Sequence, residues 1–98
     1  EESRQAALRR VVLVQYPRLE TYSLAFVTNE TKTSATGKPQ TLLTILIPNP
    51  PSPFTGPIIF VPEEDVISLN LSVEDAVKLI VSGGVVGAPL QLARATRE

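Results

Sequence analysis

Residues 41–47 read TLLTILI, a short run in which the side chains on both faces of an extended chain are mostly large and apolar. Alternate residues of a strand point to opposite faces, so a strand of this kind is buried on both sides. We therefore predict that residues 41–47 form an interior strand of a sheet, and we interpret the flanking sequence around it.

Two more strands are predicted before this one. Residues 11–14 are a compact run of valine and leucine that ends at Tyr16-Pro17, and residues 22–27 alternate large with small side chains. The turn signals between these two runs predict a hairpin. Residues 28–40 are rich in Thr, Asn, Ser, Gly and Lys and have no apolar periodicity, which predicts a flexible loop.

A proline-rich segment follows the interior strand. Residues 48–57 contain five prolines in ten positions. Proline fixes the φ angle and removes a backbone donor, so we predict a stiff, extended excursion there. Two short apolar runs come next, at residues 58–61 and 66–69, and the acidic residues 63–65 separate them. These runs predict a fourth and a fifth strand.

The clearest helix signal begins at Ser72. This residue is an N-cap candidate with Asp75 three positions later, and Gly83-Gly84 is a typical helix stop. The apolar side chains with helical spacing are Val73, Ala76, Val77 and Ile80. Together the elements predict an α+β fold, a small antiparallel or mixed β-sheet of four to five strands with one main α-helix packed on it.

Length and composition indicate one globular unit. The 98 residues are expected to form a single domain with its core at about residues 9–89, between a polar lead at residues 1–8 and a polar tail at residues 90–98. The apolar content is 43% and the charged content 19%, as in ordinary folded proteins. No apolar run approaches the roughly 20 residues that span a bilayer, so we expect this chain itself to be soluble.

Several functional classes are disfavoured by what the chain lacks. It has no histidine and no cysteine, and with them go the commonest general base, the thiolate nucleophile and the commonest transition-metal ligands. We predict no enzymatic activity, no catalytic or metal site and no cofactor. The net charge of −1 supplies no positive field for phosphates, so nucleic acid is not an expected partner.

The remaining candidate sites are surfaces for contact. The carboxylates of residues 63–65 are typical of a solvated turn, and Gly83-Gly84 follows a helix, whereas phosphate-binding glycines precede one. The rigid loop at residues 48–57 is the better candidate, together with the helix end if that end packs beside it. The predicted contact residues are Asn49, Pro50, Phe54, Ser82, Gly83 and Gly84.

Several segments, taken in chain order, resemble one family. They are RVVLVQYPR at residues 10–18, SLAFVT at 23–28, PNP at 48–50 with TG at 55–56, FVPEEDV at 60–66, and LSVEDA at 71–76 leading to SGG at 82–84. In this combination the chain resembles the domain of unknown function 502 family, which includes the plant continuous-vascular-ring membrane proteins and bacterial relatives. The resemblance covers about residues 9–89.

The resemblance implies a membrane-anchored parent protein. In that family two transmembrane helices precede a soluble portion, which this chain represents and which we place on the cytoplasmic side. No enzymatic activity is established for the family, so it supplies no catalytic residues. We expect a noncatalytic domain that mediates self-association, as a homo-oligomer, or recruits a protein partner. The alternative is a domain that binds a small ligand or a lipid headgroup, with the rigid loop as one wall of a pocket.

Overall fold

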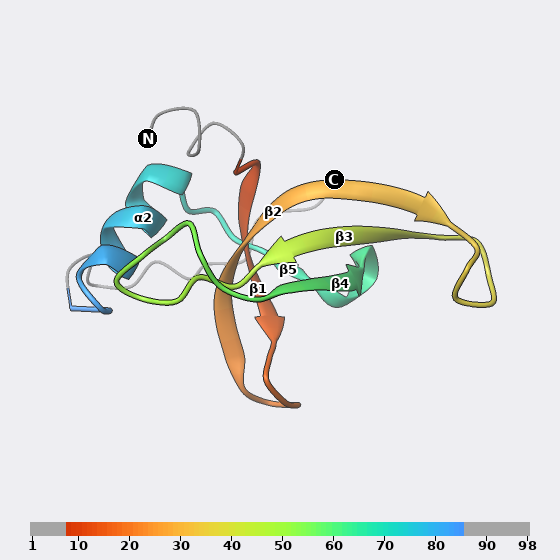
Figure 1. The fold of residues 1–98 in the computed structure, drawn as a ribbon, viewed down its shortest axis with the longest axis horizontal. Coiled ribbons are helices and arrows are strands. Elements are labelled where there is room, and N and C mark those ends of the chain that lie inside the picture. The colour runs from red at the N-terminus through yellow and green to blue at the C-terminus, as the bar shows by residue number, and fades with distance from the viewer. Residues whose placement is uncertain (1–7, 86–98) are drawn as a thin grey trace.

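In a computed structural model that describes residues 8–85, the chain forms an antiparallel sheet of five strands followed by one α-helix (Figure 1). This architecture confirms the α+β class and the antiparallel alternative for the sheet. The elements are β1 (Arg10–Gln15), β2 (Tyr22–Thr33), β3 (Gln40–Leu46), β4 (Ile58–Pro62), the 3-10 helix η1 (Glu63–Asp65), β5 (Ile67–Ser68) and α2 (Val73–Val81). The predictions for residues 1–7 and 90–98 lie outside the described residues.

The strand order is β4-β3-β2-β1-β5, so β3 has a neighbour on each side, as its two apolar faces predict. β1 and β2 form the predicted hairpin, with Gln15 opposite Tyr22 next to the turn. The first four strands are joined in sequence as neighbours, and only β5 returns to pair with an earlier strand, β1. Within residues 8–85, β4 and β5 are therefore the outermost strands of the sheet, and the outer half of β2 is paired on the β3 side alone.

The prediction of a flexible loop at residues 28–40 is wrong for most of its length. β2 continues to Thr33 and β3 begins at Gln40, so the connection is only residues 34–39. The outer half of β2 carries no buried side chain, which explains why it lacks the apolar periodicity of a core strand. Threonine nevertheless favours extended backbone, and pairing with β3 satisfies the backbone groups of this arm.

β2 changes direction where its pairing shifts register between Val27 and Asn29. An extra residue in one strand of an antiparallel pair bends that strand and increases its twist. Here the Thr28 hydroxyl donates to the Thr44 carbonyl oxygen at 3.4 Å. Figure 1 shows the result: the first part of β2 runs along β1, and the second part curves away along β3.

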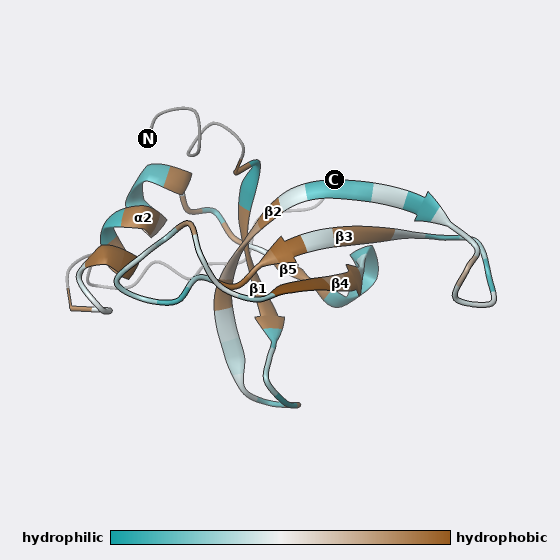
Figure 2. Cartoon of the chain, in the orientation of Figure 1, coloured by the Kyte–Doolittle hydropathy of each residue, from teal (hydrophilic) through white to brown (hydrophobic). Residues whose placement is uncertain are grey.

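Two clusters of buried apolar side chains make up the core. The first contains Val12, Val14, Ala25, Val27, Leu43, Ile45, Ile47 and Val66. The second contains Leu8, Val11, Phe26, Leu46, Leu69, Ala76 and Ile80. Neighbouring strand residues such as Val11 and Val12, or Phe26 and Val27, divide between the clusters because they point to opposite faces. Figure 2 shows that β1, β3 and β4 are largely apolar along their length, whereas the outer half of β2 is polar.

The ends of α2 agree with the sequence signals. Ser72 Oγ accepts a hydrogen bond from the Asp75 backbone N–H at 3.0 Å, which is the predicted N-cap. The helix ends at Val81, and Gly83 follows in a left-handed conformation with φ of +72°. Among residues 8–85, no helix is both long and apolar enough to span a bilayer.

The cap at Ser72 generates a stability prediction. Ser72→Ala removes the acceptor for the Asp75 N–H and is expected to lower the free energy of unfolding by about 1 kcal/mol, measured by urea denaturation. Ser34→Ala is the matched control, because Ser34 is exposed and its hydrogen bond to Gly37 uses the backbone carbonyl. Its effect should stay within about 0.5 kcal/mol. Equal effects of the two substitutions would contradict the cap.

Candidate interaction site

The proline-rich segment between β3 and β4 is a folded-back hairpin. The Ile47 N–H donates to the Pro57 carbonyl at 3.0 Å, and the Asn49 N–H donates to the Thr55 carbonyl at 2.8 Å. These bonds continue the β3–β4 ladder beyond the ends of both strands. The predicted extended excursion is wrong in this respect. The five prolines are compatible with the hairpin because backbone N–H groups of other residues supply its hydrogen bonds.

The tip of this hairpin is a tight turn. The Ser52 N–H donates to the Asn49 carbonyl at 3.1 Å, and the Phe54 N–H reaches Ser52 Oγ at 3.4 Å. The peptide bond between Pro50 and Pro51 is cis. Asn49 and Pro50, two of the predicted contact residues, are exposed in this turn. The structure thus presents them to solvent on a hydrogen-bonded support.

The hairpin is attached to the body of the domain on its returning strand. Pro53 is buried, and Phe54 is half-buried and packs against the second cluster, which contains Ala76 and Ile80 of α2. Phe54 therefore has a structural role besides the contact role predicted for it. Phe54, Ala76 and Ile80 thus share one cluster, while the packing of the helix end at residues 82–84 beside the loop stays a prediction.

Gly56 allows the hairpin to close. Its φ angle is +149°, a conformation that L side chains rarely adopt. A Cβ atom built at this position would overlap the carbonyl oxygen of Ile47, part of the rigid backbone of the facing strand. Glycine is thus required both for the local conformation and for the close approach of the two chains.

The other predicted contact residues close the end of α2. The Ser82 hydroxyl donates to the Leu79 carbonyl at 2.9 Å. The Gly83 N–H donates to Ile80 and the Gly84 N–H to Leu79, each at 2.9 Å. These bonds satisfy the last carbonyl groups of the helix. The observed role of Ser82, Gly83 and Gly84 is therefore to end the helix, and their contact with a partner stays a prediction.

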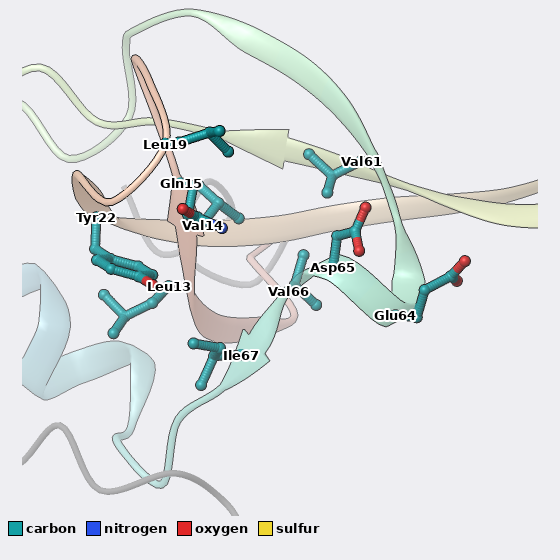
Figure 3. Close-up of a pocket in the computed structure, with 10 residues that line it drawn as sticks. All are labelled: Leu13, Val14, Gln15, Leu19, Tyr22, Val61, Glu64, Asp65, Val66 and Ile67. Atoms are coloured by element: carbon teal, nitrogen blue, oxygen red, sulfur yellow. The ribbon is translucent and has the colours of Figure 1, made fainter.

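A separate hollow of about 380 Å³ lies between the β1–β2 turn and the segment from η1 to β5 (Figure 3). Its lining is as polar as it is apolar, with Glu64 and Asp65 at one side. In Figure 3 the Glu64 carboxylate points away from the apolar lining. Both acidic residues are exposed, as expected of a solvated turn. Among residues 8–85, no group of acidic side chains could hold a metal ion.

The sequence interpretation missed an exposed apolar strand at the edge of the sheet. In β4, Ile59 and Val61 pack against the first cluster, whereas the side chains of Ile58 and Phe60 are 51% and 62% exposed. The apolar run at residues 58–61 predicts a strand but not its exposure. Its signal for an edge position was the pair of flanking prolines, since proline is confined to the edges and ends of sheets.

Comparison with known proteins identifies the family. Residues 1–55 match the family model described as "Protein of unknown function (DUF502)". The chain belongs to the DUF502 family. The resemblance inferred from the sequence segments is thereby confirmed. The DUF502 description states no catalytic activity.

Two plant relatives of this DUF502 chain come from Arabidopsis thaliana. Protein LIKE COV 1 and Protein CONTINUOUS VASCULAR RING 1 are each 29% identical to it over 79 residues. The match covers 81% of this chain but only 30% and 29% of the two relatives. The chain thus spans less than a third of these proteins. No solved structure matches it.

The closure of the hairpin at Gly56 can be tested by substitution. Gly56→Ala is expected to lower the free energy of unfolding by at least about 2 kcal/mol, because the new Cβ meets the Ile47 backbone. Gly37→Ala is the control: Gly37 also has a positive φ, +105°, but open space around it. It should cost about 1 kcal/mol, from conformation alone. If Gly37→Ala is as destabilising as Gly56→Ala, the steric argument fails.

Substitutions at Phe54 and Asn49 should distinguish a residue that stabilises the fold from one that is only exposed on the hairpin. Phe54→Ala is expected to reduce the free energy of unfolding by about 1–3 kcal/mol, less than for a fully buried aromatic ring, because half-buried packing is lost. Asn49→Ala should change it by no more than about 0.5 kcal/mol, since its side chain is exposed and its ladder bond is made by the backbone. Chemical denaturation of the two variants measures both values. An unchanged stability of Phe54→Ala would refute the structural role.

Proposed function

We propose that this DUF502 chain is a noncatalytic interaction domain of a membrane-anchored parent protein, and that it acts by self-association. The observation that carries the proposal is the exposed apolar edge strand β4, where Ile58 and Phe60 leave about half or more of their surface in solvent. Exposed apolar side chains on an unpaired sheet edge favour association with another chain.

The membrane anchor is inferred from the family. The family resemblance implies transmembrane helices ahead of this region, and the chain corresponds to less than a third of the plant relatives, which leaves ample length for such helices in a parent protein. We place the domain on the cytoplasmic side. There it would meet other copies confined to the same membrane surface.

A contact function is favoured over catalysis by the side chains that the chain offers. It contains no imidazole and no thiol, and its carboxylates in residues 63–65 are exposed to solvent. General acid–base chemistry needs a group whose proton affinity is tuned by burial or by close partners. The carboxylates of residues 63–65 instead lie exposed on the turn between β4 and β5.

The position of α2 supports the choice of β4 as the contact edge. We take the helix to be packed on one side of the sheet, where Ala76 and Ile80 share a cluster with Val11 and Phe26. This arrangement covers the part of the sheet around β1 and β2. The β4 edge lies on the other side of β3, where Phe60 stays exposed.

A second candidate function is binding of a small ligand or a lipid headgroup. The supporting observation is the hollow of about 380 Å³, whose lining is part apolar and part polar, with two carboxylates at one side. A ligand that combines an apolar part with a cationic group fits this lining best, because the carboxylates would attract the charge. The exposed ring of Tyr22 could contribute an aromatic face.

Mass and thermal stability distinguish the two functions. Light scattering over a wide range of protein concentration should show a mass that increases toward a dimer, because association follows mass action. A thermal-shift screen with lipid headgroups and small amines is run in parallel. A mass that stays constant, combined with stabilisation by one of these ligands, would replace self-association with the ligand-binding function.

A further inference from the structure

The hydrogen-bond pattern fixes which backbone groups of β4 point outward. Ile47 and Pro57 form a hydrogen-bonded pair at the base of the hairpin. In an antiparallel ladder such pairs alternate, so Ile45–Ile59 and Leu43–Val61 are the next hydrogen-bonded pairs along β3 and β4. The N–H and C=O groups of Ile58 and Phe60 therefore point away from β3. These two residues also carry the exposed side chains of the strand.

β4 has little of the protection usually found at sheet edges. Natural edge strands are kept apart by charged side chains, bulges, very short length or prolines. Residues 58–62 carry no charge, and their register with β3 is continuous. Proline is present only at the two ends, as Pro57 and Pro62. The opposite edge, β5, is only two residues long and offers little to a partner.

We propose that two copies of this chain associate through antiparallel pairing of β4 with β4, across a two-fold axis at Phe60. This inference rests on the proposed function and specifies its partner and geometry. Phe60 of each copy would exchange two backbone hydrogen bonds with Phe60 of the other. The Ile58 N–H would donate to the Pro62 carbonyl of the second copy, a pairing that does not require the N–H that proline lacks. Every outward donor of β4 is then satisfied.

The side chains of β4 fit the same geometry. Directly opposite residues of an antiparallel pair lie on one face, so the two Phe60 rings would become neighbours. Aromatic pairs of this kind add to the gain from burial. Ile58 would lie beside Pro62 of the second copy, so that apolar atoms meet apolar atoms along the whole strand.

Charge favours the antiparallel over the parallel orientation of the two β4 strands. With Phe60 on the axis, the acidic residues 63–65 of one copy lie beside residues 55–57 of the other, which are uncharged. A parallel pairing in register would instead place the two acidic segments opposite each other. Like charges at that distance repel, so the parallel arrangement is disfavoured. C2 symmetry is also the commonest symmetry of homo-oligomers.

The dimer should be weak in isolation. Stable protein interfaces bury about 1,200–2,000 Å² in total, and two short strands with two exposed side chains each provide less. We expect a dissociation constant on the order of 0.1 mM. Confinement of the parent proteins to one membrane would raise their effective concentration and favour the dimer there.

Charge introduced at the edge provides the first test. Light scattering or sedimentation from about 10 µM to about 1 mM should show dimer formation by the natural sequence and none by Phe60→Lys. Leu19→Lys is the matched control, because Leu19 is 74% exposed in the β1–β2 turn and lies outside β4. It should dimerise normally. Circular dichroism of each variant checks that the sheet is retained, and Phe60→Thr, which keeps a strand-favouring residue, provides a second variant.

Amide hydrogen exchange provides a readout at the backbone. The Ile58 and Phe60 amides should exchange rapidly at low concentration and at least tenfold more slowly at about 1 mM, where the dimer forms. The Ile59 and Val61 amides, which face β3, should be protected at both concentrations.

The possible results distinguish a failure of the β4 pairing geometry from a failure of self-association itself. A dimer that persists in Phe60→Lys and Phe60→Thr, or Phe60 amide exchange that is independent of concentration while the mass increases, would overturn β4 pairing but leave self-association intact. A natural sequence that stays monomeric to about 1 mM would overturn both.

Discussion

The sheet depends on β2 being shared by two partners. Its first half pairs with β1, and its second half pairs with β3, with Phe26 and Val27 taking part in both ladders. These two residues point into different clusters, so the same short segment supports the two faces of the sheet. The register shift just beyond Val27 turns the strand and lets the two halves follow different directions. Any change that straightened β2 would separate the two ladders.

One end of the domain is closed by packing of the hairpin and α2, whereas the β4 edge of the sheet is open to solvent. At the closed end, the hairpin of residues 47–57 is attached through Phe54, and α2 shares the same cluster through Ile80. At the open edge, β4 presents Phe60 and a row of backbone groups that no other strand within residues 8–85 pairs. The prolines contribute to both: they stiffen the hairpin, and at Pro57 and Pro62 they delimit the strand. The contact proposed here uses the open edge rather than the tip of the hairpin.

Local sequence patterns predicted most of the helices and strands, because the spacing of apolar residues indicates which side chains are buried. The two apolar faces of residues 41–47 indicated an interior strand, and Ser72 with Asp75 marked the start of the helix at its capping hydrogen bond. The outer half of β2 escaped prediction because an exposed ladder is held by backbone pairing, which leaves no apolar period in the sequence. The requirement for glycine at position 56 also cannot be predicted from local sequence, because its closeness to Ile47 arises only in the folded hairpin.

For the candidate site, the sequence selected the proline loop but not the adjoining strand. Asn49 and Pro50 are exposed as a contact surface requires, while Phe54 is used partly by the core. The apolar run around Phe60 predicts a strand, and its flanking prolines permit an edge position without establishing one. Strand order, which decides this, depends on pairing across the whole sheet.

The order of the strands also bears on how the chain reaches its native state. Four strands that are neighbours in sequence form a meander, so three hairpins can close one after another over short lengths of chain. Among residues 8–85, only the pairing of β1 with β5, Val12 with Ser68 and Leu13 with Ile67, joins distant parts of the sequence within the sheet. Docking of β5 is thus the step with the largest entropic cost of loop closure, and we expect it to come late, bringing α2 with it. Until then the meander would have two open edges, one of which the finished fold retains.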